Sequence, residues 1–408
     1  MRILLATYGS RGDIQPMLAL SVALQAAGHD VLLCGPPEHA EWVGSYQCPY
    51  HPVGRDLKSL VEQSPDAHSF RAALGFLRFL RIQAREQFNA LLPIVKKFDM
   101  VLSCSLMFHT RAIAEGFGLP HRFLAFCPQI IPSSYHPPIF IRNMNLPRWM
   151  NRFWWRAMFW GDAMNFSMVV NRMRRRLGLK PVFVGWKHVL GKRIITAFDE
   201  ELAPVPPDVK QKCLNVGYLN LDQGRSLEKK IEAFLGAGPA PMYAGFGSMP
   251  QTDPVEVTRI LVAAAGKVKQ RIVISSGWGN LGGGVEGEDV LVIGDAPHES
   301  LLPRCSLAIH HGGAGTTAYA ARAGIPQIIV PHITDQYYWG KRIFSLGLGP
   351  RPVPRSRLSI MRLIRAMTDC LENEGMKLRA GKLGDALSGR DNAARAVRII
   401  EEEYEKER

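Results

Sequence analysis

Short apolar runs alternate with longer amphipathic stretches along most of the chain. Residues 2–7 form an apolar run, a glycine-containing turn follows, and the next stretch repeats apolar residues at helical spacing as far as Gly28. A second apolar run, residues 31–34, comes soon after that glycine. This order predicts a strand, a helix and a second strand, the unit from which parallel sheets are built. Two further apolar runs, at 100–103 and 122–125, each follow a helical pattern and predict additional strands.

A second alternation of the same kind follows the proline-rich stretch APVPP at residues 203–207, which is typical of a connector. Downstream, apolar runs predict strands at 242–245, 271–275, 290–293, 307–310 and 327–331. The chain is therefore predicted to be an α/β protein with two Rossmann-like parallel-sheet domains that face a cleft. We place the domains at 1–205 and 206–391. A charged C-terminal helix at 392–408 is expected to end in solvent or to pack back across the connector.

The composition is that of a globular protein and excludes several classes. The chain has 408 residues, 47% of them hydrophobic, which is enough for two domains with cores of their own. Its seven cysteines are scattered without a C-x-x-C pair, so neither a disulfide framework nor a zinc module is expected. The first residues form a core-like strand, not a signal peptide, and no uncharged apolar stretch reaches transmembrane length. We expect a reduced, cytoplasmic setting.

The formal net charge of +14 is compatible with binding to nucleic acid, to an anionic membrane or to acidic small molecules, and also with a solvated basic surface. Two common phosphate-binding motifs are missing. The chain lacks G-x-G-x-x-G followed by an acidic residue about twenty positions later, which argues against a nicotinamide dehydrogenase. It also lacks G-x-x-x-x-G-K-[ST], which argues against a P-loop kinase or ATPase.

The stretch HHGGAGTTAYAARAG at residues 310–324 carries the clearest signal for a phosphate site. A predicted strand ends in two histidines, three glycines allow close backbone approach, and Thr316 and Thr317 begin a helix. Free amides and the positive end of a helix dipole would then attract an anion. The alternative is a tight turn in which Thr316 merely caps the helix.

Two further turns place polar side chains at the carboxyl edges of predicted strands, where α/β sheets bind ligands. Asp335 and Gln336 follow the strand at 327–331, and an acid with an amide suits sugar hydroxyls, which both donate and accept hydrogen bonds. The alternative is an N-cap for the next helix. GSRGDIQP at residues 9–16 places Arg11 and Asp13 between a strand and a helix, where Asp13 is either catalytic or an N-cap.

Five motifs in this order and spacing, GSRGDIQP, FGSM, DAPHESLLP, HHGGAGTT and GIPQIIVPHITDQ, resemble those of family 1 glycosyltransferases with the GT-B fold. The similarity covers almost the whole chain and is closest to bacterial antibiotic-aglycone enzymes and sterol glucosyltransferases. It implies transfer of a hexose, with inversion, from a UDP- or TDP-sugar to a hydroxyl of a lipophilic acceptor such as a sterol, lipid, polyketide or phenol. The chain contains no Asp-x-Asp, so we expect no metal ion, and no cofactor besides the nucleotide-sugar co-substrate.

The resemblance also implies a role for individual residues. Asp13 matches the general base that faces the acceptor hydroxyl. Arg11 is expected to lean toward the diphosphate or to hold Asp13 ionised. The residues that match the donor site are Ser10, Arg11, Ser248, Trp278 (nucleobase, or a half-buried structural side chain), His311, Gly313, Gly315, Thr316 and Thr317 (pyrophosphate), and Asp335 and Gln336 (sugar).

Two positions depart from the plant members of the family. Asp295 stands where those enzymes carry a tryptophan that stacks on the base, and Tyr319 where they carry a ribose-binding glutamate. The choice between uridine and thymidine diphosphate therefore stays open.

Residues 140–176 combine many arginines with four tryptophans and a single acid, Asp162. In the family this part of the chain walls the acceptor pocket, and aromatic side chains suit a flat or greasy aglycone. The same mixture is typical of a surface that contacts anionic lipid, as is the basic amphipathic stretch at 70–88, so peripheral contact with the inner membrane face is a second interpretation. Ordinary helix packing with arginines facing water is the third.

Other functions remain as alternatives to the transferase. A sugar-nucleotide epimerase or hydrolase on the same fold would turn over without an acceptor. A non-catalytic homologue would bind the nucleotide-sugar alone. A nucleic-acid-binding protein would account for the net charge, but the chain contains no recognisable reader module, and we expect no nucleic acid partner.

Overall fold

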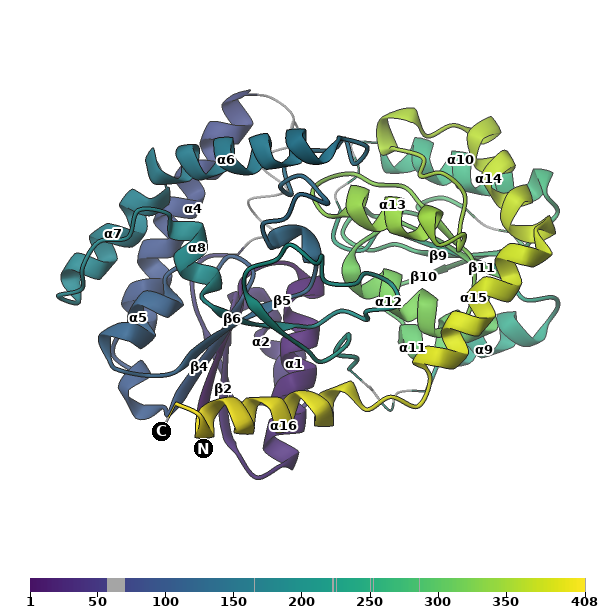
Figure 1. Ribbon diagram of the computed structural model, residues 1–408. Helices are drawn as coiled ribbons and strands as arrows, with labels where there is room; N and C mark the ends of the chain where they lie inside the picture. The colour runs from purple at the N-terminus through teal and green to yellow at the C-terminus, as the bar shows by residue number, and fades with distance from the viewer. Residues whose placement is uncertain are drawn as a thin grey trace.

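Two parallel β-sheets organise the chain in the computed structural model, which describes residues 1–56, 70–164, 166–221, 224, 226–249, 251, 253–285 and 287–407 (Figure 1). The first sheet has the strand order β3-β2-β1-β4-β5-β6-β7. Its strands are β1 (Arg2–Ala6), β2 (Asp30–Gly35), β3 (Tyr50–Pro52), β4 (Met100–Cys104), β5 (His121–Ala125), β6 (Arg193–Thr196) and β7 (Lys212–Asn215). Each pair of neighbouring strands in it is parallel.

The second sheet has the order β10-β9-β8-β11-β12 and is also parallel. Its strands are β8 (Met242–Gly245), β9 (Ile272–Ser275), β10 (Val290–Ile293), β11 (Leu307–His310) and β12 (Gln327–Ile329). In both sheets the order changes direction next to the first strand of the domain, β1 or β8, as it does in doubly wound folds. The predicted α/β class with two parallel-sheet domains is confirmed.

Helices cover both faces of each sheet, which explains why the strands read as apolar runs without alternation. The helices of the first half are α1 (Arg11–Ala26), α2 (Ala40–Gly44), α4 (Phe70–Leu91), α5 (Thr110–Gly116), α6 (Arg148–Met164), α7 (Phe166–Arg176) and α8 (Gly185–Leu190). Those of the second half are α9 (Lys229–Gly236), α10 (Pro254–Lys267), α11 (His298–Leu301), α12 (Ala314–Arg322), α13 (Gln336–Ser345), α14 (Ile360–Glu372), α15 (Glu374–Leu387) and α16 (Asn392–Glu405).

The proline-rich connector at 203–207 lies inside the first domain. It joins β6 to β7, and both strands belong to the seven-stranded sheet, in which Ile194 pairs with Cys213. A division of the chain at residue 205 would cut this sheet. The segment that leads from one sheet to the other therefore follows β7.

Helix α16 returns from the second domain and packs on α1 of the first (Figure 1). Its buried residues Ala396, Val397 and Ile400 share a core cluster with Leu18 and Leu24 of α1. This contact places the end of the described chain against the sheet with which the chain begins.

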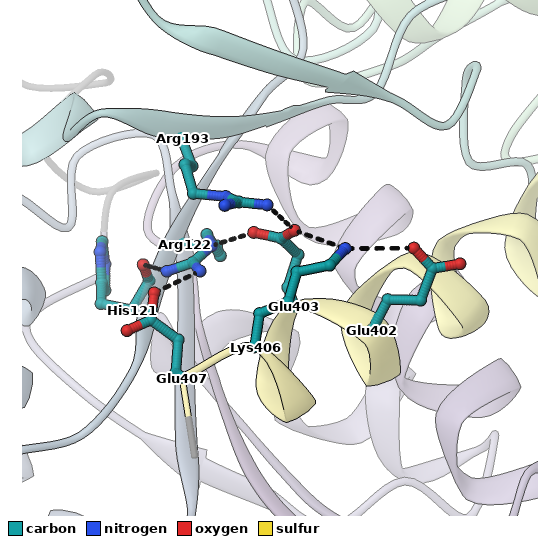
Figure 2. Close-up of polar contacts among 7 residues, drawn as sticks. All are labelled: His121, Arg122, Arg193, Glu402, Glu403, Lys406 and Glu407. Carbon is teal, nitrogen blue, oxygen red and sulfur yellow. Dashed lines mark hydrogen bonds and ion pairs between the residues drawn. The ribbon is translucent and has the colours of Figure 1, made fainter.

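An ionic network holds the last turns of α16 to strands β5 and β6 (Figure 2). The side chain of Glu403 is only 1% exposed, and its carboxylate accepts hydrogen bonds from Arg122, at 3.0 Å, and from Arg193. Arg122 also contacts Glu407 at 2.7 Å, and Lys406 lies 3.6 Å from Glu403. Arg122 is itself 6% exposed, so loss of Glu403 would leave a nearly buried guanidinium with only Glu407, at the edge of the network, as its counter-ion.

Candidate active site

Asp13 lies in the first turn of α1, directly above the carboxyl end of β1. Ser10, not Asp13, is the N-cap residue of this helix. The Oδ2 atom of Asp13 accepts hydrogen bonds from the backbone N–H of Ser10, at 2.9 Å, and from its hydroxyl, at 3.4 Å. Asp13 therefore forms a capping box with Ser10, and these hydrogen bonds fix the position of its Oδ2 atom.

The other edge of the Asp13 carboxylate is held by Ser105, which sequence reasoning did not identify. The Ser105 hydroxyl donates to Oδ1 at 2.5 Å. Ser105 follows β4 and has a φ of 52°, a conformation that side chains other than glycine seldom adopt and that is found at functional sites. A Cβ atom on Gly9 would lie 2.1 Å from Oδ2, so glycine at that position makes room for the carboxylate.

Asp13 and Asp335 interact electrostatically across the two domains. Burial raises the pKa of Asp13, while the hydrogen bonds from Ser105 and Ser10 oppose that rise. Burial also raises the pKa of Asp335 to about 6; the Thr334 hydroxyl, which donates to Oδ1 at 3.1 Å, lowers it, and the charge of Asp13 raises it further. Asp13 follows the carboxyl end of β1 and Asp335 follows β12, and each carboxylate has a raised pKa.

Helix α12 presents its first turn without a side-chain cap. Its N-cap residue is Gly313, and no described side chain bonds to the amides of the first turn. Thr316 is therefore not the cap, and the hydroxyl of the buried Thr317 donates back to the carbonyl of Gly313 at 2.9 Å. The Thr317 hydroxyl is thus already hydrogen-bonded within the helix, whereas no described side chain bonds to the amides of the first turn.

The imidazole of His311 is sandwiched between two glycines at this turn. A Cβ atom on Gly313 would lie 2.4 Å from its Nε2 atom, and one on Gly247 would lie 3.2 Å from its Cε1 atom. Burial lowers the pKa of His311 well below its ordinary value, with smaller contributions from His310 and His332. The ring is therefore neutral near pH 7 and can donate one hydrogen bond, from whichever nitrogen carries the proton.

The loops after β8 and β9 meet beside this histidine. The backbone N–H of Trp278 donates to the carbonyl of Gly247 at 3.0 Å, which brings Trp278 next to the loop that carries Ser248. Both side chains are half-buried. On the other side of α12, a Cβ atom on Gly315 would lie 2.8 Å from the hydroxyl of Tyr218, so that glycine permits close packing.

The amide oxygen of Gln336 accepts hydrogen bonds from the backbone of its own loop. Oε1 accepts from the N–H groups of His332, at 2.7 Å, and Ile333, at 3.0 Å, and the NH₂ group points at the sulfur of Met249 at 3.2 Å. Asp335 occupies the N-cap position of α13, but its carboxylate makes no capping bond. Asp335 is thus the N-cap residue of α13, as the alternative predicted, but its side chain does not cap the helix.

Arg11 contacts Asp295 and Trp42 and not Asp13, and its contact with a diphosphate stays a prediction. Its Nη1 atom lies 2.6 Å from Oδ1 of Asp295, and its guanidinium carbon lies 4.5 Å from the ring centroid of Trp42. Gln15, one turn further along α1, donates to the hydroxyl of Tyr319 at 2.8 Å. Asp295 and Tyr319, the two positions that depart from the plant enzymes, therefore both contact α1.

Comparisons with known proteins agree with this geometry. Residues 3–120 match the glycosyltransferase family 28 N-terminal domain, and residues 259–402 match the erythromycin biosynthesis protein CIII-like C-terminal domain. The chain is 32% identical over 412 residues to glycosyltransferase GtfE of Amycolatopsis orientalis, covering 98% of this chain and 97% of GtfE. It belongs to the family 1 glycosyltransferases. This glycosyltransferase is also 30% identical over 418 residues to the sterol 3-beta-glucosyltransferase UGT80A2 of Arabidopsis thaliana, covering 98% of the chain and 65% of UGT80A2.

Solved structures show that the glycosyltransferase has the GT-B fold. It superimposes on the glycosyltransferase of kitacinnamycin with a TM-score of 0.74 at 18% identity, covering 98% of each chain. The glycosyltransferase VinC, solved in complex with dTDP, gives a TM-score of 0.71 at 19% identity over 100% of both chains. Family and fold together identify a nucleotide-sugar-dependent enzyme, as the motifs predicted.

The basic aromatic segment of the glycosyltransferase exposes aromatic side chains as well as arginines. On α6, the side chains of Trp149, Phe153 and Trp160 are 65%, 57% and 68% exposed, whereas Trp155 is buried. Arginines of α6 face water, as the third interpretation expects, but these three large aromatic side chains do so as well. In the related stretch at 70–88, the side chains of residues 70–78 lie outside the described part of the structure.

The start of this segment reaches the second domain next to Asp335. The guanidinium of Arg142 lies 5.8 Å from the ring centroid of Tyr337, and Lys341 donates to the carbonyl of Met144 at 2.5 Å. His136 packs edge-on against Tyr338, with 5.8 Å between ring centroids. The segment therefore lies against α13, the helix that begins at the candidate sugar site.

Neither a metal site nor a membrane span was found in the described residues. No group of three or more His, Cys, Asp or Glu side chains is arranged there to hold a metal ion. None of the helices described there combines the length and apolar character needed to cross a bilayer.

Proposed function

We propose that this glycosyltransferase moves a hexose from a UDP- or TDP-sugar to a hydroxyl of a lipophilic acceptor, with inversion and without a metal ion. The observation that carries the proposal is the orientation of Asp13 by Ser10 and Ser105, opposite the carboxylate of Asp335. A carboxylate held at both edges has its remaining lone pairs in a fixed direction, as a general base needs.

In the proposed reaction, the acceptor oxygen attacks the anomeric carbon while Asp13 accepts the acceptor's proton. A free aspartate has a pKa of about 4 and cannot deprotonate an alcohol outright. It can take the proton as the new C–O bond forms, because the oxygen then becomes acidic, and such a base contributes roughly 10²–10⁴-fold. The raised pKa of Asp13 favours this role, since it makes the carboxylate a stronger base.

The departing diphosphate takes the electron pair of the breaking C–O bond. We assign its stabilisation to the uncapped amides of α12 and to the neutral imidazole of His311, which donates a hydrogen bond. Gly313, Gly315, Thr316 and Ser248 complete this part of the site. These protein donors take the place of a metal ion, in keeping with the lack of an Asp-x-Asp motif in the sequence.

Asp335 is proposed to accept hydrogen bonds from sugar hydroxyls, and the NH₂ group of Gln336 to donate one. Trp278 is proposed to pack on the base. Relatives supply the substrate classes: one is named vancomycin aglycone glucosyltransferase, others sterol 3-beta-glucosyltransferase, and neighbouring structures carry thymidine diphosphate. We infer that the acceptor is polycyclic or otherwise hydrophobic.

The proposal is tested with the Asp13→Asn variant. Asparagine keeps the shape of the side chain but cannot accept the proton, so kcat should fall roughly 10²–10⁴-fold while the KM for the donor changes little. Product stereochemistry tests inversion, and activity after treatment with a chelator tests metal independence. Full activity of Asp13→Asn would refute the assignment. Nucleotide release that needs no acceptor would favour the hydrolase or epimerase instead.

We further propose that α6 brings the enzyme to an anionic membrane at its inner face, where a lipophilic acceptor would be found. The support is the exposure of Trp149, Phe153 and Trp160 on a helix that also carries Arg148, Arg152 and Arg156. Tryptophan sits at the level of lipid headgroups, and arginine pairs with their phosphates.

A further inference from the structure

Five arginines gather around a groove in the second domain, at the end of α13 away from the candidate sugar site. The groove has a volume of about 650 Å³ and is lined by the C-terminal end of α13, residues 349–354, helix α14 and the start of α15. The only carboxylate among its described lining residues is that of Asp369. The lining arginines are Arg351, Arg357, Arg362, Arg365 and Arg379.

Neutral groups hold three of these side chains in place. Arg379 Nε donates to the carbonyl of Gly347 at 3.0 Å, and Arg362 Nη1 donates to the carbonyl of Arg357 at 3.0 Å. The guanidinium carbon of Arg351 lies 5.3 Å from the ring centroid of Phe344. These contacts position the guanidinium groups and leave most of their five N–H donors unused by the described residues.

Within the described part of the chain, none of the five arginines takes part in an ion pair. Surface arginines elsewhere in the same domain do, such as Arg259 with Glu256 at 2.6 Å and Arg304 with Glu232 at 2.5 Å. All five groove arginines are exposed. Among the described lining residues, the carboxylate of Asp369 offsets only part of the charge of the five arginines, and an anion that entered the groove would relieve the repulsion between the guanidinium groups.

We propose that this groove binds a soluble ligand with at least two phosphate groups, at a site separate from the nucleotide-sugar cleft. The planar fork of arginine matches phosphate oxygens in pairs, and five forks exceed what one phosphate can use. The volume falls in the range of small-ligand sites, about 300–1,000 Å³. Phe344, 40% exposed, is the one large exposed apolar side chain among the described lining residues, which suits a soluble molecule better than a lipid surface.

The test uses the full chain with its cleft first saturated with UDP, so that phosphate binding at the donor site does not contribute. Calorimetric titration with inorganic tripolyphosphate should then show one further binding event. The double variant Arg362→Ala and Arg365→Ala should weaken that event at least roughly ten-fold, because each lost guanidinium removes charge-assisted hydrogen bonds. Alanine preserves the helix.

The matched control is Arg395→Ala with Arg398→Ala on α16, which are exposed, have the same spacing and remove the same charge. It should leave tripolyphosphate binding unchanged. An equal loss of tripolyphosphate affinity in both double variants would overturn the proposal. So would a lack of tripolyphosphate binding by the UDP-saturated protein. Binding only to phosphatidylglycerol vesicles, lost in the Arg362→Ala and Arg365→Ala variant, would assign the groove to a lipid headgroup and overturn the soluble ligand. If UDP does not bind in the saturation step, TDP takes its place, and failure of the donor site would show separately as binding of neither nucleotide.

Discussion

Arg11 and Asp295 form an ion pair that joins helix α1 of the first domain to the loop after β10 in the second, with 2.6 Å between Nη1 and Oδ1. Both side chains are partly open to solvent, at 31% and 47% exposure. The pair of Arg122 and Glu403 also bridges distant parts of the chain but is almost completely buried, at 6% and 1%. The two ion pairs should therefore contribute different amounts to the free energy of unfolding.

The first prediction concerns stability. Asp295→Asn should lower the free energy of unfolding by less than about 1 kcal/mol, because water screens exposed pairs. Glu403→Gln should lower it by about 3 kcal/mol or more, because it strips a buried arginine of its main partner. Chemical denaturation measures both values. Similar losses in the two variants would contradict the role assigned to burial.

The second prediction uses two glycines of one turn. Gly9→Ala should displace the Asp13 carboxylate, since its Cβ would lie 2.1 Å from Oδ2, and a shift of about 1 Å costs roughly 10²-fold in turnover. Gly12→Ala is the control, because its Cβ meets nothing nearer than the Ser10 hydroxyl at 3.7 Å. Steady-state kinetics with both variants distinguishes them. An active Gly9→Ala enzyme would mean that the carboxylate need not stay in this position.

The third prediction treats Ser105 as a positioning residue for Asp13. Its hydrogen bond opposes the rise in the pKa of Asp13, so Ser105→Gly should raise that pKa further. The acidic limb of the kcat/KM profile should then move to higher pH. Glycine accepts the φ of 52° without strain, so the backbone should stay in place. An unmoved acidic limb would remove Ser105 from the mechanism.

The fourth prediction concerns Asp335, whose pKa burial raises to about 6. Between the unfolded pKa of about 4 and this value, the folded protein holds a proton that the unfolded chain has lost. Asp335 therefore contributes stability below about pH 4 that is lost as the pH rises through 6. Asp335→Asn should gain stability relative to wild type over this window. Denaturation at pH 4 and pH 7 tests it, and a constant difference between the two proteins would be inconsistent with the raised pKa.

The fifth prediction tests the membrane contact of α6. Replacement of Trp149 and Trp160 by serine should weaken sedimentation with phosphatidylglycerol vesicles by roughly ten-fold, because two interfacial anchors are lost. Val255→Ser with Leu378→Ser, which removes exposed apolar residues of the second domain, should have no effect. Salt should release the wild-type protein. If that protein fails to bind vesicles at low ionic strength, α6 has another role.

Much of the fold was predictable because most strands in these two sheets are buried on both faces. Continuous apolar runs marked β1, β2, β4, β5 and β8–β12. Three strands were missed for identifiable reasons. Strand β3 has only three residues and β7 is half-exposed, so neither forms an apolar run, and β6 follows a helical segment that breaks the earlier rhythm.

Local motifs predicted the site better than distant contacts did. Asp13 and His311 follow the ends of strands, and a short stretch of sequence marks each of them as a candidate site residue. The partners of Asp13 and Arg11 are another matter: Ser105 lies 92 residues from Asp13, and Asp295 is supplied by the other domain. No local pattern sets such pairs, since the packing of whole domains brings them together. The φ of Ser105 is likewise visible only in the folded chain.

The return of α16 to the first domain bears on how the protein is made. The ribosome delivers this helix only after the entire second domain has emerged, so the apolar face of α1 that receives Ile400 is uncovered throughout that interval. Synthesis of the first domain thus starts before that of the second, but its packing is completed only when α16 reaches α1. Any pause in translation between β7 and α16 extends the time for which this apolar surface of the nascent chain is exposed to chaperones and to other nascent chains.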